Sequence, residues 1–490
     1  MRSTVPFYRE PLGLLTDLYQ LTMAQGYWRS GHADREAVFH LYFRRLPFQG
    51  GYAVACGLGA VLDWIASLRF TPDDLAYLAT LPGNDGSPLF AADFLAYLGA
   101  LEVTLHVDAI PEGTLAFAQE PLVRVQGPLI QCQLVETALL TFINFQTLIA
   151  TKAARICEAA GGDEVLEFGL RRAQGPDGGL SASRAAFVGG AHATSNVLAG
   201  RLFGIPVKGT HAHSWVMSFG DEVEAFRAYA EALPNNCVFL VDTFDTLEGV
   251  RRAAAEGLRL KSLGHRLAGV RLDSGDLAYL SIEARKILDA HGLHDAAVVA
   301  SNDLDEHLVT SLKHQGAAIS VWGIGTRLVT ASDQPALGGV YKLSAVRDPG
   351  GDWQHRVKVS EQPAKTSTPG IHQVRRFVRD GVFVADMIYD ASTDGPPGHT
   401  MIDPFDPTRR RTFADDLGHH DLLVPVLRGG RPVYTLPDLV DTRAHARTQV
   451  AALHPAVRRL DHPHEYPVGL EASLYALRTR LVLEARGLTE

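Results

Sequence analysis

The sequence predicts an α/β fold: an irregular, TIM-like α/β barrel with an N-terminal α/β domain and a smaller C-terminal region. From about residue 136 onward, short apolar runs alternate with longer helical patterns, as in successive βα units. Polar residues and glycines follow the ends of these runs one after another. This distribution favours a barrel, because an open doubly wound sheet gathers its functional residues at one switch point.

The length of 490 residues is too great for one compact core, so more than one domain is expected. We predict an N-terminal α/β domain over residues 1–135, the barrel over 136–345, and a C-terminal region over 346–490. The last region is rich in proline and glycine and is the least regular part of the pattern.

Each domain has its own series of expected elements. The N-terminal domain contains helical patterns at 14–31, 61–68 and 91–98 and strand-like patterns at 37–44, 101–107 and 115–127. In the barrel region a long helix over 135–161 precedes strands expected at 165–169, 205–210, 237–242, 267–273, 296–301 and 318–325. The helices expected after these strands cover 183–204, 218–234, 246–257, 276–292 and 305–316. Short strands and a final helix over 470–485 are expected in the C-terminal region.

Composition narrows the class of protein. The net charge of -9 argues against a nucleic-acid binder held by phosphate contacts. The four cysteines are scattered and form no CxxC pair, which suits a reducing cytosol. The N-terminus lacks a signal-peptide pattern, and no apolar run is long enough to span a bilayer. We therefore expect a soluble cytoplasmic protein that binds neither nucleic acid nor membrane.

The segment GVRLDSGD, residues 269–276, places two carboxylates around the end of an expected strand. Asp273 and Asp276 in this arrangement suit a site that handles Mg²⁺ together with phosphate. The alternative is that Asp273 and the following Ser274 only cap the next helix.

Two further segments suit anion binding. The glycine-rich turn WGIGT, residues 322–326, could hold a phosphate on its backbone N–H groups, and LGGVYK at 337–342 adds two glycines and a lysine. Arg171, in the loop segment 167–179, is suited to bidentate capture of a carboxylate or phosphate. The alternative for Arg171 is an ion pair with a neighbouring acid such as Glu167.

Two histidines, His211 and His213, follow the strand expected at 205–210. Strand alternation would place both imidazoles on one side, as metal ligands, a catalytic base, a phosphoryl acceptor or surface groups. A metal-dependent hydrolase of the amidohydrolase kind uses such a pair but needs further histidines on later strands. The later strand ends here carry Asp, Asn, Ser and Gly, which disfavours that interpretation.

Nine segments together resemble the nicotinate phosphoribosyltransferase family, and they occur in the family's order. They are TDLYQLTM (16–23), EFGLRRAQGPDGG (167–179), SNVLAG (195–200), GTHAHSWVMSF (209–219), VDTFDT (241–246), VRLDSGDL (270–277), SNDLDE (301–306), GIGT (323–326) and GGVYKL (338–343). The resemblance covers nearly the whole chain except its last hundred or so residues.

The resemblance implies a type II phosphoribosyltransferase that acts as a homodimer with active sites at the subunit interface. It implies that nicotinate and phosphoribosyl pyrophosphate give nicotinate mononucleotide and pyrophosphate, the entry step of NAD salvage. It also implies coupled hydrolysis of ATP as co-substrate, hence a ligase-type classification, with Mg²⁺ as cofactor.

The same resemblance assigns roles to residues. His213 holds the position of the phosphorylated histidine, while Asp273 and Arg271 belong to the catalytic group, and Asp273 and Asp276 to the metal end. Phe168 is expected to stack on the pyridine ring, with Tyr19 of the partner subunit on its other face, and Arg171 to supply positive charge. The residues expected to contact the phosphates and the rest of the substrate are Thr210, Ser301, Gly323, Gly325, Thr326, Gly338, Gly339, Lys365 and Ser367.

Asn196 is expected to set the choice of base, because relatives that use the amide are expected to carry an aspartate there, and an asparagine does not repel a carboxylate. The segment KTSTPG departs from the family pattern: Ile371 and His372 stand where many relatives carry lysines. The competing functions are a nicotinamide phosphoribosyltransferase and a non-enzymatic sensor or scaffold. Product formation with each base, with and without ATP, separates them.

Overall fold

The structure is a computed structural model that describes residues 11–488. These residues form two compact units. Unit 1 takes its residues from Met1–Leu148 and Ala336–Glu490, and unit 2 is the continuous segment Ile149–Pro335. The segments that the sequence assigns to separate N-terminal and C-terminal domains thus share unit 1, and the three-domain division stays a prediction.

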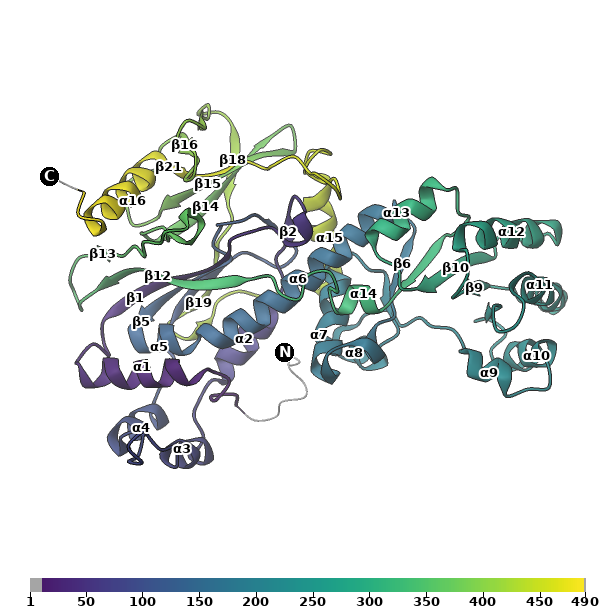
Figure 1. Ribbon diagram of the computed structural model, residues 1–490, viewed down its shortest axis with the longest axis horizontal. Coiled ribbons are helices and arrows are strands. Elements are labelled where there is room, and N and C mark those ends of the chain that lie inside the picture. Colours follow the sequence, from purple (N-terminus) through teal and green to yellow (C-terminus); the bar gives the residue numbers. More distant parts are fainter. Residues whose placement is uncertain (1–10, 489–490) are drawn as a thin grey trace. The chain divides into compact units, whose positions relative to one another are not determined.

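Unit 2 is built around a six-stranded parallel sheet with the spatial order β7-β6-β11-β10-β9-β8. Its strands are β6 (Glu164–Glu167), β7 (Ala193–Thr194), β8 (Val238–Leu240), β9 (Gly269–Leu272), β10 (Ala297–Asn302) and β11 (Val321–Ile324). The helices between and after them are η2 (Leu170–Arg172), α7 (Gly175–Val188), α8 (Val197–Phe203), α9 (His213–Met217), α10 (Glu222–Ala232), α11 (Thr246–Ser262), α12 (Leu277–Ala290), α13 (Glu306–His314) and α14 (Thr326–Val329). In Figure 1 helices α11 and α12 lie on the outer side of β9 and β10.

The closed TIM-like barrel expected from the sequence is not confirmed. From β8 to β11 each strand pairs with the next, and β11 returns to pair with β6, but β7 and β8 do not pair within the described residues. A single parallel bridge joins Thr194 to Val207 on one side of this gap. On the other side the backbone N–H of Leu240 donates to the imidazole Nε2 of His211 at 3.3 Å. A side chain therefore makes the link that a backbone ladder would otherwise make.

The helix predicted over residues 183–204 is wrong in its middle. Helix α7 ends at Val188, and the two-residue strand β7 and the separate helix α8 follow. A Cβ on Gly189 would lie 2.2 Å from the carbonyl oxygen of Ala150, and Gly190 has a φ of 119°, which other residues rarely adopt. The paired glycines thus end the helix, although the apolar periodicity continues past them.

Helices α10 to α13 begin in the same way. Each has an aspartate N-cap whose side chain accepts the N–H of the residue three positions on, and these caps are Asp221, Asp245, Asp276 and Asp305. Such caps pair an N–H that no helical carbonyl reaches and place negative charge at the positive end of the helix dipole. Acidic residues just before these helices therefore have an architectural role.

The described residues of unit 1 form two larger sheets and one small one. The seven-stranded sheet has the order β13-β12-β1-β5-β3-β19-β20, the six-stranded sheet has the order β17-β16-β21-β15-β14-β18, and β2 pairs with β4. The strands of the seven-stranded sheet are β1 (Glu36–Phe43), β3 (His106–Ala109), β5 (Val123–Pro128), β12 (Gly339–Arg347), β13 (Gln354–His355), β19 (Val424–Arg428) and β20 (Arg431–Pro432). The strands of the other two are β2 (Ala53–Val54), β4 (Leu115–Ala116), β14 (His372–Arg379), β15 (Val382–Asp390), β16 (Thr400–Ile402), β17 (Arg410–Thr412), β18 (Gly418–Asp421) and β21 (Val468–Glu471).

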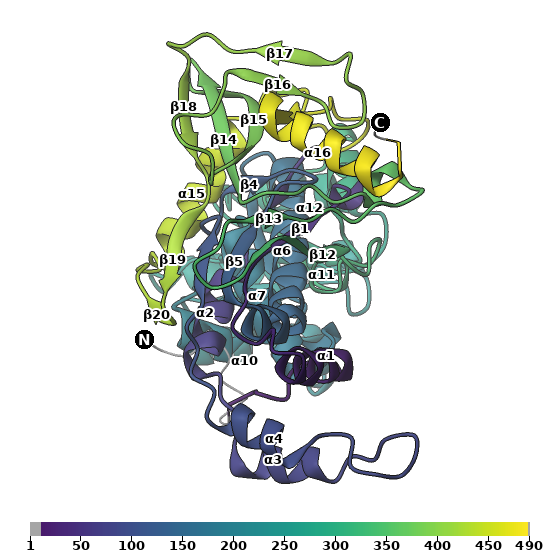
Figure 2. The same ribbon diagram turned by 90° about the vertical axis from the view of Figure 1, so that its left-hand side faces the viewer.

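The described helices of unit 1 include three α-helices that the sequence pattern did not predict, α3, α5 and α15. The full set is α1 (Leu18–Arg29), η1 (Pro47–Gln49), α2 (Leu58–Ser67), α3 (Pro72–Ala79), α4 (Ala92–Gly99), α5 (Leu129–Leu134), η3 (Pro363–Lys365), α15 (Leu439–Ala451) and α16 (Ala472–Ala485). Helix α6 (Glu136–Ala160) runs from unit 1 into unit 2. Figure 2 shows α16 beside β16 of the six-stranded sheet. Within the described residues, no helix is long and apolar enough to cross a membrane.

Candidate active site

A pocket of about 520 Å³ lies in unit 2, where the parallel strands end. Ten of the residues expected from the sequence line it: Phe168, Arg171, Thr210, His213, Arg271, Asp273, Ser301, Gly323, Gly325 and Thr326. The other lining residues are His211, a candidate from the sequence without an assigned role, and Leu170, Arg172, Ser195, Gly209, Ala212, Leu240, Asn302 and Asp303, which the motifs did not assign to binding. The expectation that functional groups from successive strand ends meet at one edge is thus met by the geometry of unit 2.

Arg271 donates hydrogen bonds to three side chains of the pocket wall. Its Nε donates to Ser301 Oγ at 2.8 Å, its Nη1 to Thr210 Oγ1 at 2.7 Å, and its Nη2 to Asp273 Oδ1 at 2.9 Å. Ser301 Oγ also donates to Asp273 Oδ1. The guanidinium thus ties β9 to the end of β10 and to the segment before α9. This cluster holds a positive group and a carboxylate at fixed positions on the pocket wall.

Asp273 is ionised at neutral pH. Burial acts to raise its pKa, but hydrogen bonds from Ser301 and Arg271 and the charge of Arg271 hold that pKa below its usual value. Asp242 holds the backbone of the same residue, since its Oδ2 accepts the backbone N–H of Asp273 at 2.9 Å and the hydroxyl of Ser274 at 2.6 Å. Asp273 is therefore held in place through both its side chain and its backbone.

His213 is the first residue of α9, and its side chain is 39% exposed, so a ligand in the pocket can reach it. Its Nδ1 lies 3.1 Å from Thr243 Oγ1 and its Nε2 lies 3.8 Å from Asp273 Oδ2. The Thr243 hydroxyl therefore fixes the plane of the imidazole ring. Thr243 is a site residue that sequence reasoning missed, although it follows directly after a strand-end aspartate.

His211 differs from its neighbour, and the expectation that both imidazoles share one side of a strand is not met. Residues 208–212 form no strand, and His211 is only 7% exposed, with its ring packed among Phe226, Tyr229 and Phe239. Burial lowers the pKa of His211 to about 4. Its imidazole is therefore neutral at pH 7, and its Nε2 accepts the N–H of Leu240.

Phe168 requires a glycine opposite its ring. A Cβ on Gly323 would lie 2.8 Å and 2.9 Å from two ring carbons of Phe168, closer than real Cβ contacts allow. The backbone N–H of Phe168 donates to the carbonyl of Ile324 at 2.8 Å. One function of the glycine-rich turn is thus to leave room for the aromatic ring in the pocket.

A buried carboxylate positions the backbone after Phe168. Glu167 is 1% exposed, and its two oxygens accept from the N–H of Gly169, from Ser183 Oγ at 2.8 Å and from Thr194 Oγ1 at 2.5 Å. This network joins β6, α7 and β7. From the sequence, Glu167 was expected only as an alternative ion-pair partner of Arg171, but the described residues contain no ion pair of Arg171.

Asn196 does not line the pocket. It is 2% exposed and is the N-cap of α8, with its Oδ1 accepting the N–H of Ala199 at 3.2 Å. Its Nδ2 donates to Ser183 Oγ at 3.1 Å. The preceding residue, Ser195, lines the pocket. Of these two neighbours, Ser195 is therefore the one placed to contact a ligand in the pocket.

Asn302 marks strain in the pocket wall. Its φ is 130°, which is uncommon for a residue other than glycine, and its Oδ1 accepts the N–H of Asp303 at 2.8 Å. Residues in such conformations persist where the surrounding structure holds them, and they concentrate at functional sites. The sequence alone gives no signal of this strain beyond the identity of the residue.

The remaining expected site residues lie elsewhere. Asp276 caps α12 and does not line the pocket. Tyr19, Gly338, Gly339, Lys365 and Ser367 all belong to unit 1. Tyr19 is 48% exposed on α1, whereas Ser367 is 2% exposed and its Oγ accepts the N–H of Lys358 at 2.8 Å. Their expected part in a site shared between subunits stays a prediction.

The donor set near Asp273 fits the expected Mg²⁺. Asp242 Oδ1 is buried without a hydrogen-bond partner. A free carboxylate oxygen beside an ionised aspartate suits a hard cation that prefers oxygen ligands. Within residues 11–488 no group of three or more His, Cys, Asp or Glu side chains could hold a metal. These residues therefore suit a Mg²⁺ ion that is held by one or two carboxylates together with the phosphates of a substrate.

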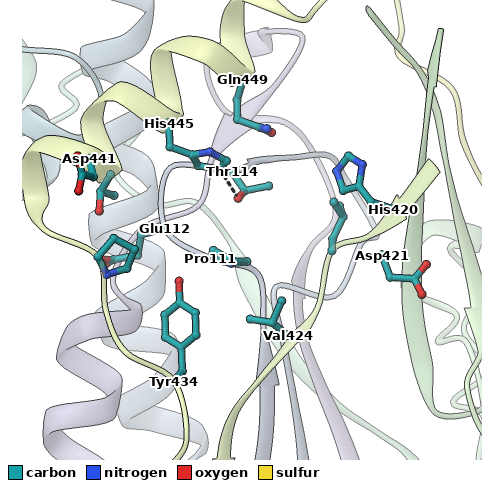
Figure 3. Close-up of a pocket in the computed structure, with 13 residues that line it drawn as sticks. Pro111, Glu112, Thr114, His420, Asp421, Val424, Tyr434, Asp441, His445 and Gln449 are labelled. Carbon is teal, nitrogen blue, oxygen red and sulfur yellow. Dashed lines mark hydrogen bonds between the residues drawn. The ribbon is translucent and has the colours of Figure 1, made fainter. Parts of the chain in front are cut away.

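A second cavity, of about 380 Å³, lies within unit 1 (Figure 3). Many of its polar groups bind one another or neighbouring groups: His445 Nε2 lies 3.0 Å from Thr114 Oγ1, and Glu112 Oε1 accepts the N–H of Gly57 at 2.7 Å. The carboxylate of Asp421 points away from the cavity in Figure 3 and pairs with Arg375 at 2.9 Å. The functional groups expected from the sequence are absent from this lining, so the unit 2 pocket is the candidate active site.

Comparisons with known proteins agree with the motifs. Residues 14–144 match the family model of the nicotinate phosphoribosyltransferase (NAPRTase) N-terminal domain, and residues 371–478 match that of the nicotinate phosphoribosyltransferase C-terminal domain. The nicotinate phosphoribosyltransferase of Bacillus subtilis (strain 168) is 43% identical over 500 residues, which cover 99% of this chain and 98% of the relative. That of Homo sapiens is 39% identical over 521 residues, which cover 95% of each.

Solved structures agree in fold. The crystal structure of human nicotinic acid phosphoribosyltransferase has a TM-score of 0.82 with 36% identity, and the match covers 95% of this chain and 99% of that one. A nicotinate-nucleotide pyrophosphorylase from Pyrococcus furiosus has a TM-score of 0.67 with 21% identity, which is a likeness of fold alone, over 90% of this chain and 95% of that one.

Proposed function

The chain belongs to the nicotinate phosphoribosyltransferase family, and we propose that it joins nicotinate to the ribosyl group of phosphoribosyl pyrophosphate. The pyridine nitrogen forms a bond to ribosyl C1 as the bond from C1 to the pyrophosphate oxygen breaks. The products are nicotinate mononucleotide and pyrophosphate. The observation that carries the proposal is the cluster of Arg271, Asp273 and Ser301 in a pocket that also contains Phe168.

The pocket residues suit the charges that develop in this reaction. Positive charge grows on the sugar as the bond to pyrophosphate breaks, while the departing pyrophosphate gains negative charge. The fixed guanidinium of Arg271 stabilises the leaving group, and the ionised Asp273 lies on the same wall. Mg²⁺, held by Asp273 and Asp242 with the substrate phosphates, would neutralise the pyrophosphate.

The base and the ribose phosphate have different partners. Phe168 provides a flat face for the pyridine ring, and Arg171 and Arg172 line the same pocket and suit the nicotinate carboxylate. Ser301, Gly323, Gly325 and Thr326 are proposed to hold the 5′-phosphate. Thr210, fixed by Arg271, supplies a further hydroxyl.

We assign the ATP-dependent step to His213. In this proposal an imidazole nitrogen attacks the γ-phosphorus of ATP, ADP leaves, and a phosphohistidine forms that is hydrolysed as the transfer proceeds. The accessible imidazole, held by Thr243 and facing Asp273, supports this role. The added negative charge would reorganise nearby arginines and Mg²⁺ and so couple ATP hydrolysis to the transfer.

The cellular setting proposed for this activity is the salvage of pyridine for NAD in the cytoplasm, by a homodimer. Tyr19 would then complete the site of the partner subunit, and Gly338, Gly339, Lys365 and Ser367 are proposed as further substrate contacts. Their position in unit 1, outside the unit 2 pocket lining, is compatible with that arrangement.

The test is product formation by the purified protein with nicotinate or nicotinamide, with and without ATP. The proposal expects nicotinate mononucleotide, a higher kcat/KM for nicotinate than for nicotinamide, and stimulation by ATP. A higher kcat/KM for nicotinamide would assign the protein to the amide-using branch. Absence of product from both bases would favour a sensor or scaffold.

A further inference from the structure

A third cavity, of about 190 Å³, lies wholly within unit 1 and has two arginines in its lining. Arg478 comes from helix α16, and Arg44 follows strand β1 directly. Thr366 and Thr368 add two hydroxyl groups, and Phe405 adds an apolar face. Neither the motifs nor the proposed reaction assigns a function to this cavity.

Arg478 carries a buried charge with no counter-charge. Arg478 is 9% exposed, and its Nε is buried without a hydrogen-bond partner. Its Nη1 makes one long hydrogen bond, to the carbonyl of Pro404 at 3.4 Å. In the part of the chain that the structure describes, no carboxylate forms an ion pair with Arg478. A buried guanidinium in this state is costly, because it has lost water and gained only one long hydrogen bond and no counter-charge.

The acidic residues that line the cavity are already paired elsewhere. Asp403 lies 3.4 Å from Arg409 and also accepts the backbone N–H of Phe405 at 2.8 Å. Glu465 lies 3.2 Å from the same Arg409 and is largely exposed. The Nε of Arg44 is also buried without a partner. Three guanidinium groups, those of Arg44, Arg409 and Arg478, thus face two carboxylates and leave one positive charge in excess. Within the described residues, neither carboxylate forms an ion pair with Arg44 or Arg478.

We propose that this cavity binds a small oxyanion, of the carboxylate or phosphate type, between Arg478 and Arg44. A guanidinium matches the geometry of both groups through paired N–H donors. Thr366 and Thr368 can donate further hydrogen bonds, while Phe405 leaves space for an apolar or aromatic part of the ligand. Lys365 and Ser367, which alternate with these threonines along the chain and are proposed above as substrate contacts, do not line the cavity.

The proposal explains why a buried Arg478 is tolerated. Without an anion, the guanidinium lowers the stability of the folded chain, and burial lowers the pKa of Arg478. A bound anion removes that cost and adds charge-assisted hydrogen bonds. The protein should therefore gain stability from anions through this residue, independently of any reaction in unit 2.

The test compares the full-length wild-type protein with Arg478→Met and Arg480→Met. Arg480 lies on the same helix but is 63% exposed, so it is the matched control. Thermal unfolding and calorimetric titration are run in anion-poor buffer with added inorganic phosphate or benzoate. Phosphate bound in the unit 2 pocket affects all three proteins equally and cancels from the comparison.

In anion-poor buffer, Arg478→Met should unfold at the same temperature as the wild type or higher. With phosphate or benzoate, the wild type and Arg480→Met should gain a higher midpoint, and Arg478→Met should lose at least tenfold in affinity. A response to phosphate alone identifies a phosphate-type ligand, and a response to benzoate alone a carboxylate. An equal anion response in all three proteins overturns the proposal, and so does a lower midpoint of Arg478→Met without anion. If that variant does not fold, Arg44→Met is measured in its place, with the same loss of affinity expected.

Discussion

The carboxylate of Glu167 accepts a hydrogen bond of 2.8 Å from Ser183 Oγ, and the same carboxylate accepts the N–H of Gly169. This pair of contacts connects helix α7 to the backbone directly after Phe168. The aromatic ring of the candidate active site is therefore positioned by a residue that does not line the pocket.

Glu167→Gln tests this positioning role. A glutamine offers one acceptor oxygen in place of two, so at least one of the three donors loses its partner, at a cost of about 1–3 kcal/mol in the free energy of unfolding. With Phe168 less well held, kcat/KM for nicotinate should fall about tenfold or more, mainly through KM. Urea unfolding and steady-state kinetics measure both effects. Glu164→Gln, at the other end of β6, is the control and should change neither by a comparable amount.

His213→Asn should abolish ATP hydrolysis and the stimulation of transfer by ATP, leaving at most slow ATP-independent transfer. His211→Asn should keep both activities within a few-fold where it folds, because its imidazole is buried against three aromatic rings. The measurement is acid-labile label transferred to each variant from ATP with a radioactive γ-phosphate. Label that disappears with His211 but persists without His213 would show that the phosphorylated residue is misassigned.

The stability of unit 2 should decrease below neutral pH through His211. Its pKa is about 4 in the folded chain against about 6.5 when unfolded, so the unfolded state binds more protons between these values. Above about pH 6.5 the imidazole is neutral in both states, and His211 does not lower the free energy of unfolding. As pH falls toward 4, that free energy decreases by about 3 kcal/mol at most, because the unfolded chain binds the proton and the folded chain does not. Urea unfolding at pH 7 and pH 5 should show a smaller pH effect in His211→Asn than in the wild type. Equal slopes would contradict the assignment.

Base preference should depend on position 195. Ser195→Asp places a carboxylate in the pocket, where it repels nicotinate and accepts from the amide of nicotinamide. The ratio of kcat/KM for nicotinate to that for nicotinamide should fall by tenfold or more. Asn196→Asp, the change indicated by the sequence, instead removes the donor to Ser183 and puts a charge near Glu167. Asn196→Asp should therefore mainly reduce the free energy of unfolding. If Asn196→Asp instead changes the preference for nicotinate and Ser195→Asp does not, Asn196 sets the choice of base.

Shared active sites predict complementation between two inactive proteins. Tyr19 lies in unit 1 and Arg171 in unit 2, so Tyr19→Ala and Arg171→Ala damage different contributions to a shared site. After mixing under conditions that exchange subunits, activity should return, because some mixed dimers contain one intact site. Subunit exchange is checked with differently tagged proteins. Exchange without recovered activity would mean that each chain builds its own site.

The βα series was predictable because its strands are short apolar runs bounded by glycine and polar residues. Strand β7 was missed because its two residues lie inside an alanine-rich pattern with helical periodicity, and the helix ends only at the Gly189–Gly190 pair, where Gly190 has a φ of 119°. Whether the sheet closes depends on the pairing of β7 with β8, which no local pattern specifies.

The candidate site shows a similar division. Asp273 and Ser301 were found because groups at the ends of parallel strands converge, whereas Arg271 was found through the family resemblance. Glu167 and Thr243 were missed because their roles are contacts with residues distant in sequence. Ser195 and Asn196 are adjacent in sequence, but Ser195 lines the pocket whereas Asn196 donates to Ser183 away from it. The sequence does not show which of two adjacent side chains faces the pocket.

The glycine opposite Phe168 also has an evolutionary consequence. Any mutation at position 323 adds a side-chain carbon where the aromatic ring now lies, so it is tolerated only after residue 168 has become smaller or has moved. The order of the two changes is therefore constrained, and a lineage that keeps the ring keeps the glycine. Across relatives, the two positions should vary together, and unpaired substitutions should be rare.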